Sequence, residues 1–575
     1  MMTTPIMRNL HSLRSSHRLS ALRLAAFLAT GVIMAPVLAQ PIVIPPAAES
    51  GVLQQRQIEE DRRRREQERL APVAPDPLRR PDAPVVPQVS PSASAVRFEV
   101  REIRFTPSEI LAPADLEAIA AQYRGRQVSL ADLQELAAKV NALYQARGVV
   151  TAIAIIGPQD ISAGVVEVRL VEGKVGEVDI SGNATTRKSY IQARLGLVGG
   201  EIVDLNKLED SLVWFNLTND VRLEASLQSG KNFGSTDILV NAVEPDQHQL
   251  LATLDNLGSP MTGRWRAGIS YRNRSLLGFR DDLALAYTYA EGQDSGSVGY
   301  GFPLNRWGGR INYSYYDDAT SIRNGPLASL KITGRSHAHV LSLRQPVYVK
   351  NDLQIDLTAG AKKRDSNNYI DSVFLQRTDT TDASIGVEAQ GADEKSLWGV
   401  GINRAHGTSK TLDTRMPFKV TKGSLRYNRD VADGWSLRSN AVWQYAKNGN
   451  LAASEQFLIG GEGSVRGYDV GVYSGDQGYT VNVELHHRIG VVALAGRNLA
   501  ATGFLFVDHG RVEPFRPPNS LLRRSEHLTG LGYGVNASLG KQTSVRMTLA
   551  HGIDPVPQGG KKNMVFSIQL LHSLF

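Results

Sequence analysis

The chain has 575 residues, a formal net charge of +7 and no cysteine. Without cysteine, a disulfide framework, a thiol nucleophile and a cysteine-based metal site are all excluded. The charged residues, 21% of the chain, are scattered over many short segments and form no basic domain, so nucleic acid is not expected as a partner. A membrane-spanning helix needs roughly 20 consecutive apolar residues, and only the N-terminus comes near this.

Residues 1–39 are predicted to be a secretory signal peptide. Basic side chains precede the apolar run of residues 24–38, and residues 37–39 then offer small or modest side chains to a signal peptidase. A membrane anchor is the alternative, but the run is only about 15 residues long and contains Pro36. The mature chain is expected to begin near Gln40.

Residues 40–70 are predicted to form an N-terminal segment with a polar helix over residues 52–70. The helix has no Gly or Pro and places acidic before basic residues at i,i+4 in Glu59/Arg63, Glu60/Arg64 and Asp61/Arg65. A helix that is polar all round cannot pack onto an apolar core, so it is either solvated or fills a wet cavity as a plug. Its length of about 28 Å is comparable to a bilayer core. Residues 71–95 are rich in proline and are predicted to be an extended linker.

Residues 96–173 and 174–245 are predicted to form two small α/β modules with the same order of one strand, two helices and two strands. In the first module the elements are expected near residues 96–105, 114–123, 130–147, 149–156 and 165–171, with a bulge in the first strand where the alternation shifts. In the second they are expected near residues 175–180, 189–197, 205–217, 221–228 and 236–243. Each helix pair should cover one face of a small sheet. Neither module carries a visible ligand motif, so both are expected to be binding or spacer modules.

Residues 246–575 consist of short segments that alternate between apolar and polar side chains. Leu283, Leu285, Tyr287 and Tyr289 are separated by smaller or polar residues, and the same pattern recurs over residues 353–358. A soluble sandwich also alternates, but the many strands, the Gly-, Asp- and Asn-rich connections and the predicted signal peptide favour a transmembrane barrel.

The number of strands follows from the length of this region. At about 20 residues per strand and connection, it provides roughly 16 antiparallel strands, enough to enclose a lumen that holds water or a plug. The last residue is Phe575, whose parity is opposite to that of Phe566 and Ile568. Either a bulge or a strand that ends early would explain this.

The order of these segments resembles the outer-membrane transporters of two-partner secretion, the ShlB-type haemolysin secretion/activation proteins of the BamA-like superfamily. The first module carries Gly148-Val149-Val150-Thr151, Pro158-Gln159-Asp160-Ile161 and Val171-Glu172-Gly173, which are similar to a POTRA domain of this family. The barrel region begins with Asp255-Asn256-Leu257-Gly258-Ser259, which is similar as well. The resemblance implies two POTRA domains (96–173 and 174–245) in the periplasm, followed by a barrel in the outer membrane.

The most specific match runs from Glu455-Gln456-Phe457 to Ser464-Val465-Arg466-Gly467-Tyr468. It resembles the family's long extracellular loop, which folds back into the barrel. The segment Phe506-Val507-Asp508-His509-Gly510 resembles its partner motif on a barrel strand. The resemblance implies that Arg466 pairs with Asp508 in the lumen, as a latch that controls gating. Because desolvation offsets much of the attraction within a buried ion pair, such a latch is expected to fix the position of the loop more than to stabilise the barrel.

By the same resemblance, the protein would recognise an unfolded partner exoprotein through POTRA surfaces within residues 96–245 and translocate it to the cell surface through a plugged barrel. The individual binding residues stay open. The cargo would be a large β-helical adhesin or a haemolysin-like cytolysin. Outer-membrane lipids, and the barrel assembly machinery during biogenesis, would be further partners.

Two other functions stay open. A BamA-like insertion factor is disfavoured because the chain has only two modules with a polar helix before them. A passive porin would explain the barrel but neither residues 96–245 nor the latch. The sequence has no G-x-S-x-G, H-E-x-x-H or Walker motif. No enzymatic activity, metal or cofactor is therefore expected.

Overall fold

The computed structural model describes residues 44–69, 77–79, 97–149, 151–350, 352–446, 449–494, 496–515, 525–556 and 564–575. The predicted signal peptide and most of the predicted linker lie outside the described residues. Residues 45–575 form one compact unit. None of the described helices is long and apolar enough to cross a membrane.

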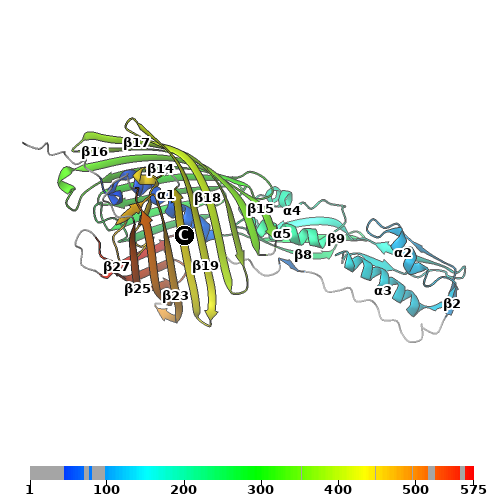
Figure 1. Ribbon diagram of the computed structural model, residues 1–575. Helices are drawn as coiled ribbons and strands as arrows, with labels where there is room; N and C mark the ends of the chain where they lie inside the picture. The colour runs from blue at the N-terminus through cyan, green and yellow to red at the C-terminus, as the bar shows by residue number, and fades with distance from the viewer. Residues whose placement is uncertain are drawn as a thin grey trace, which may run out of the picture. The chain divides into compact units, whose positions relative to one another are not determined.

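Sixteen antiparallel strands close into a barrel within the described residues, as the length of the region predicts (Figure 1). The last strand, β27, pairs with the first, β10, and so closes the barrel. The strands are β10 (His248–Asp255), β11 (Arg266–Asn273), β12 (Asp282–Ala290), β13 (Gln293–Pro303), β14 (Arg310–Ser321), β15 (Ile332–Lys350), β16 (Leu353–Ile370), β17 (Val373–Ala392), β18 (Ser396–Thr411), β19 (Thr414–Ala432), β20 (Trp435–Ala446), β23 (Gln477–Leu494), β24 (Arg497–Glu513), β25 (Glu526–Leu539), β26 (Thr543–Gly552) and β27 (Met564–Ser573).

The two faces of the barrel wall differ in chemistry, as the alternation predicts. Large apolar side chains are exposed on the outer face, and Leu285, Tyr287 and Tyr289 of β12 are examples. Polar side chains such as Ser336 and Ser366 are buried instead, on the inner face. An outer face that is apolar and an inner face that is polar suit a barrel surrounded by lipid.

The C-terminus explains the change of parity at Phe575. Strand β27 ends at Ser573, so Phe575 lies beyond the strand. The carbonyl oxygen of Phe575 accepts a hydrogen bond of 3.2 Å from the backbone N–H of Leu250. Of the two explanations that the sequence leaves open, the strand that ends early is correct.

The first α/β module contains β2 (Arg97–Val100), β3 (Glu102–Phe105), α2 (Pro113–Ala120), β4 (Arg126–Ser129), α3 (Leu130–Ala146), β5 (Ile153–Ile155) and β6 (Val165–Val171). The predicted bulge is wrong: the chain instead breaks into β2, which pairs with β4, and β3, which pairs with β6. Helix α3 begins at a capping box in which Ser129 and Asp132 bond each other's backbone N–H. Its apolar face, with Leu136 and Val140, packs in one core with the sheet.

The second module contains β7 (Lys174–Ser181), α4 (Lys188–Leu195), α5 (Leu205–Thr218), β8 (Arg222–Ser229) and β9 (Ser235–Val243). Leu208, Leu212 and Phe215 of α5 are buried in the core that this module's sheet and helices share. A short strand that the sequence does not predict, β1 (Leu78–Arg79), completes the sheet in the order β1-β8-β9-β7. A segment of the predicted linker thus forms part of this module.

Candidate functional site in the barrel lumen

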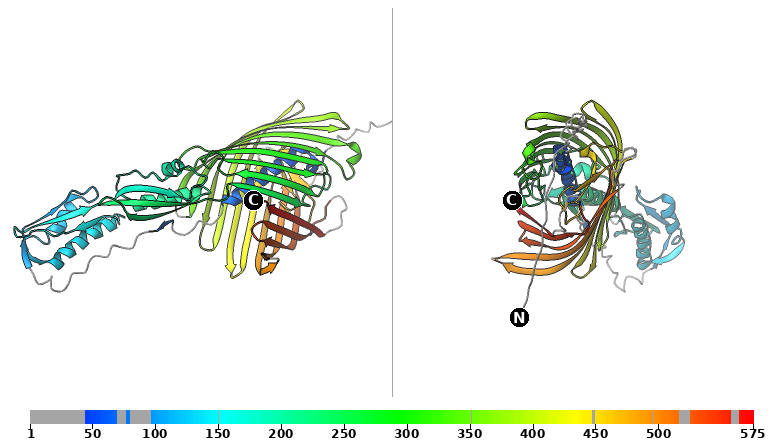
Figure 2. Two further views of the ribbon diagram at one scale, coloured as in Figure 1. Left: turned by 180° about the vertical axis from the view of Figure 1, so that it is seen from behind. Right: turned by 60° about the vertical axis from the view of Figure 1, so that its left-hand side comes forward.

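Helix α1 (Ser50–Arg69) lies inside the barrel (Figure 2). It follows a short 3-10 helix, η1 (Pro46–Ala48). Its hydrogen-bonding and ionic partners come from strands that are spread around the wall: Arg272 on β11, Ser336 on β15, Ser366 on β16, Glu388 on β17 and Lys422 on β19. Since one helix can reach all of these strands only from within, α1 lies in the cavity that the barrel encloses.

Polar side chains fix the helix to the wall. Near its start, Gln54 donates a hydrogen bond of 2.8 Å to the carbonyl oxygen of Ser336 and accepts another from the hydroxyl of the same residue. The ion pairs within the described helix join Arg56 to Glu60, Arg62 to Glu66 and Arg64 to Asp61, in place of the three predicted pairs. Glu59 instead pairs with Lys422 of the wall at 3.1 Å. Charged side chains of the wall therefore replace helix residues as ion-pair partners.

The second occupant of the lumen is the segment between β20 and β23. It contains a 3-10 helix, η4 (Ala453–Glu455), and an antiparallel hairpin of β21 (Phe457–Ile459) and β22 (Tyr473–Gly475). The tip of the hairpin carries the predicted latch residues. Val465 is fully buried in a small apolar core with Ile459, Val512 and Leu528.

Arg466 and Asp508 lie in direct contact. The Nε and Nη2 atoms of Arg466 donate to the two carboxylate oxygens of Asp508, each at 2.7 Å, and the backbone N–H of Arg466 donates to the same group at 3.1 Å. Arg466 is only 4% exposed and Asp508 is 0% exposed. A planar guanidinium that bonds both oxygens of a carboxylate fixes direction as well as distance. The contact therefore holds the tip of the hairpin in one position against β24.

Phe506 and Glu484 complete the surroundings of Arg466. The guanidinium carbon lies 3.5 Å from the centroid of the Phe506 ring, which is a cation–π contact. The remaining Nη1 atom donates to Glu484 of β23, and Glu484 also accepts from Arg546 and His486, both at 2.7 Å. The alternation of β23 indicates that Glu484 faces the lumen, but only the register of the strands places it beside Arg466.

The other predicted latch residues allow the hairpin to lie close to the wall. Gly467 has a φ of +92°, and a Cβ there would lie 2.5 Å from the backbone nitrogen of Gly552. A Cβ on Gly510 would lie 2.9 Å from a methyl group of Val465. The hydroxyl of Tyr468 donates to the carbonyl oxygen of Thr529 at 2.8 Å. All seven predicted residues of the latch and its partner strand thus meet at one place.

A second ionic cluster, which sequence reasoning did not find, joins the loop to helix α1. Glu455 of η4 accepts from Lys362 at 2.9 Å and from Arg364, both on β16. The same two cations donate to Gln55 of α1, at 3.0 and 2.9 Å. Helix and loop are therefore coupled through two shared cations. The motif that begins at Glu455 is visible in the sequence, but nothing in the spacing indicates that β16 supplies its partners.

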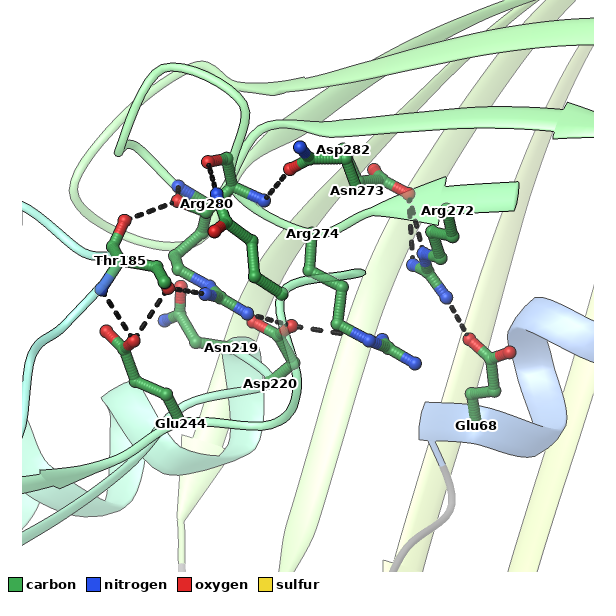
Figure 3. A network of polar contacts seen from close by, with 12 residues as sticks. Glu68, Thr185, Asn219, Asp220, Glu244, Arg272, Asn273, Arg274, Arg280 and Asp282 are labelled. Atoms are coloured by element: carbon green, nitrogen blue, oxygen red, sulfur yellow. Dashed lines mark hydrogen bonds and ion pairs between the residues drawn. The ribbon is translucent and has the colours of Figure 1, made fainter. Parts of the chain in front are cut away.

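A third cluster joins the second α/β module to the barrel (Figure 3). Arg280, in the turn between β11 and β12, is fully buried and bonds both carboxylate oxygens of Asp220, which precedes β8; the Nε–Oδ1 distance is 2.9 Å. Arg280 also donates to the hydroxyl of Thr185 at 3.2 Å, and that hydroxyl donates to Glu244 at 2.6 Å. Burial alone would raise the pKa of Asp220, but hydrogen bonds and charge from Arg280 and Arg274 hold it below its ordinary value.

This cluster ends close to helix α1. Arg274, directly after strand β11, lies 3.9 Å from Asp220, while Arg272 on β11 pairs with Asp282 and with Glu68 in the last turn of α1. Figure 3 shows Arg274 beside Asp220 of the module and Arg272 beside Glu68 of the helix. The end of the helix and the junction with the module thus depend on adjacent cations of the wall.

Replacing Asp220 with Ala is expected to loosen this junction, because Arg280 would lose both bonds to the carboxylate while it stays buried. A hydrogen bond to a charged group contributes about 1.5–3 kcal/mol, so hydrogen exchange in the turn of residues 274–281 should rise at least about tenfold. Lys231→Ala is the matched control, since its pair with Glu177 in the same module is exposed. Equal exchange in Asp220→Ala and the parent protein would contradict a role for Asp220 in the junction.

Among the described residues, no group of three or more His, Asp or Glu side chains is arranged to hold a metal ion. On the predicted substrate-binding surfaces within residues 96–245, the contacts described above select no individual residues. The lumen, with helix α1, the loop and their contacts, is therefore the candidate functional site.

Comparison with known proteins gives this site a context. Residues 234–537, more than half of the chain, match the family model "Haemolysin secretion/activation protein ShlB/FhaC/HecB", and residues 98–173 match "POTRA domain, ShlB-type". Outer membrane transporter CdiB of Dickeya dadantii is 27% identical over 81% of this chain and 84% of its own. The heme/hemopexin transporter protein HuxB of Haemophilus influenzae is 23% identical over 76% of this chain and 80% of its own.

The solved structure of CdiB from Escherichia coli resembles the fold with a TM-score of 0.63 at 19% identity, and covers 91% of this chain and 98% of its own. The closed barrel of sixteen strands, the ShlB-type POTRA domain and the match over the barrel agree with one another. The chain belongs to the haemolysin secretion/activation family ShlB/FhaC/HecB and is an outer-membrane transporter of two-partner secretion, with its POTRA region in the periplasm.

Proposed function

We propose that this transporter exports an unfolded partner exoprotein through a barrel that two segments of its own chain keep closed. One observation carries the proposal: helix α1 and the hairpin tip with Arg466 both occupy the lumen, and both are held to the wall by polar and ionic contacts. Water can replace contacts of this kind, whereas a large apolar interface would be costly to open. The barrel is therefore suited to be a gated conduit.

The proposed sequence of events begins in the periplasm. The exoprotein binds the POTRA surfaces, helix α1 leaves the lumen, and the loop shifts as the contact between Arg466 and Asp508 opens. The cargo is then threaded outward and folds at the cell surface. The periplasm offers no ATP, so folding outside the cell is the proposed source of free energy.

The proposed cargo is a large secreted β-helical adhesin or a haemolysin-like cytolysin. The family match and the two relatives, whose names describe transporters, support a protein cargo. Residues 1–39 would direct the chain across the inner membrane, and the barrel assembly machinery would insert it among outer-membrane lipids. We propose no enzymatic activity and no cofactor. A BamA-like insertion factor remains the second candidate, because the superfamily includes such proteins.

A secretion assay tests the proposal. The probe is the product of a neighbouring reading frame that encodes a large repeat protein, expressed with and without this chain. Export into the medium should require the chain, while the levels of other outer-membrane barrels stay constant. An exoprotein that reaches the medium equally well without the chain would contradict the proposal. A fall in the other barrels would favour the insertion factor.

A further inference from the structure

The connection between strands β18 and β19 lies at the extracellular end of the barrel. Strand β10 leads away from the second α/β module, which lies in the periplasm, and neighbouring strands of the barrel are antiparallel. Each even-numbered strand from β10 to β20 therefore runs outward, so β18 reaches the cell surface at Thr411. Strand β19 returns toward the periplasm from Thr414. The outer face of this hairpin therefore meets the outer leaflet of the membrane.

Five exposed basic side chains lie on the outer face of this hairpin and form a basic patch: Arg404, His406, Lys410, Arg415 and Lys419. Lys422 of β19 bonds helix α1 inside the barrel, so side chains at odd distances from it along β19 point outward. In the register of the hairpin, Lys410 lies opposite Arg415 and His406 lies opposite Lys419. Opposite residues share a face, and like charges in such positions destabilise a strand pair.

The protein itself does not neutralise the basic patch. Within the part of the chain that the structure describes, no ion pair involves a side chain of the patch. Outward cations of neighbouring strands do have partners, since Arg335 pairs with Asp317 at 3.1 Å and Arg377 pairs with Asp379 at 2.8 Å. Asp379 lies opposite Lys410 in the register of β17 and β18, yet it bonds Arg377. Repulsion that the chain leaves uncompensated indicates a functional site, here one for an anion.

The periplasmic end of the patch lies at the edge of the apolar surface that faces lipid. Next to Arg404 on the same face of β18, Ile402 and Val400 are 52% and 40% exposed. Arg404 lies opposite Thr421 of β19, which in turn lies opposite Tyr445 of β20. An exposed tyrosine on a barrel strand is typical of the boundary between hydrocarbon and headgroups. Arg404 therefore lies at the depth where the headgroups of the outer leaflet begin.

We propose that the basic patch binds lipopolysaccharide, the phosphorylated glycolipid of the outer leaflet. Arg404 and Lys419 would contact a phosphate of its lipid anchor, and the planar fork of the arginine suits phosphate oxygens. Lys410 and Arg415, four residues farther from the membrane and thus about 13 Å along the strands, would contact the acidic inner sugars. The inference rests on the location in the outer membrane and does not depend on the proposed cargo.

The shape of the patch favours this glycolipid over other anions. A soluble anion would use the charges but not the apolar surface of Ile402 and Val400, which can hold acyl chains. A phospholipid has the acyl chains, but its single phosphate at the boundary would leave Lys410 and Arg415 without a partner. A lipid with phosphates at the boundary and further negative charges beyond it matches both parts of the patch.

A binding experiment tests the proposal. Fluorescently labelled lipopolysaccharide is titrated into the full-length protein, freed of bound lipid, in detergent. Arg404→Gln with Lys419→Gln should bind it at least about tenfold more weakly than the parent, because two charge-assisted contacts are lost. Both side chains are exposed on the outer face, so the barrel should still fold, which heat-dependent gel mobility verifies.

The matched control removes two cations that already have partners. Lys331 pairs with Asp371 at 2.9 Å and Arg335 pairs with Asp317 at 3.1 Å, both toward the extracellular end. Lys331→Gln with Arg335→Gln should therefore keep the affinity within about twofold of the parent. If this control and the patch variant lose affinity equally, or if neither loses any, the patch is not the binding site.

Two further probes identify the ligand. Dephosphorylated lipopolysaccharide should bind the parent as weakly as the intact glycolipid binds the patch variant. Phosphatidylglycerol should bind the parent less tightly than lipopolysaccharide, and equal affinity for the two lipids would overturn the assignment to the glycolipid. A patch variant that binds lipopolysaccharide normally but exports less exoprotein would assign the patch to the exported protein and overturn the proposal as well.

Discussion

Replacing Arg466 with Ala is expected to abolish export of the exoprotein while the barrel still assembles. The change leaves Asp508 fully buried without the guanidinium that bonds both of its oxygens. Removing one partner of a buried ion pair costs about 3–5 kcal/mol, enough to free the hairpin tip from β24. The sixteen-strand wall does not depend on this contact, because its strands are joined by their own backbone ladders. Asp508→Ala is expected to have the same effect, because it removes the carboxylate that Arg466 bonds.

The measurement is exoprotein in the medium, together with the heat-dependent gel mobility that reports a folded barrel. Arg264→Ala is the matched control, since its ion pair with Asp469 of the same loop is about half exposed and should contribute little. Arg466→Lys should export only weakly, because an ammonium group cannot reproduce the two parallel bonds. Normal export by both Arg466→Ala and Asp508→Ala would show that the contact is not a latch.

The sequence predicts the barrel well because the alternation that defines each strand is contained in a few consecutive residues. Each strand exposes one face to lipid and the other to the lumen, so a period of two is visible within a few residues, as in Leu285, Tyr287 and Tyr289. The Arg466–Asp508 contact is also predicted, but through the resemblance of two motifs. Glu484 and the Lys362–Glu455 pair depend on which strands are neighbours and in which register. No single segment contains that information.

Two further predictions, the ion pairs of helix α1 and the linker at residues 78–79, fail because the observed partners lie far away in the sequence. The charges of helix α1 suggest pairs within the helix, yet Glu59 pairs with Lys422 because the wall offers a partner in a confined space. Strand β1 is missed because a proline-rich composition indicates an extended linker, and a two-residue strand has no periodicity to detect. Its only signal is Leu78, whose burial becomes evident once the sheet of the second module is assembled.

Deleting residues 52–70 is expected to raise the conductance of the barrel in planar bilayers from mostly closed to steadily open. The deletion removes nearly all of helix α1, and with it the side chains that bond strands from β11 to β19. Because the inner wall is polar, water and ions should fill the space that the helix leaves. The loop with Arg466 would still narrow the lumen, so the double variant that also carries Arg466→Ala should conduct more than the deletion alone.

Two comparisons decide what the conductance means. Arg64→Ala is the control, since Arg64 is more than half exposed and its pair with Asp61 spans 3.9 Å, so this variant should stay closed. A passive porin would conduct steadily both with and without the helix, and an unchanged conductance would remove the plug role from residues 52–70. If the deletion opens the pore but export falls, the helix has a role in export besides closing the pore. Its loss would then also remove Gln55 and so disturb the contact between Lys362 and Glu455, through which the helix and the loop hold each other in place.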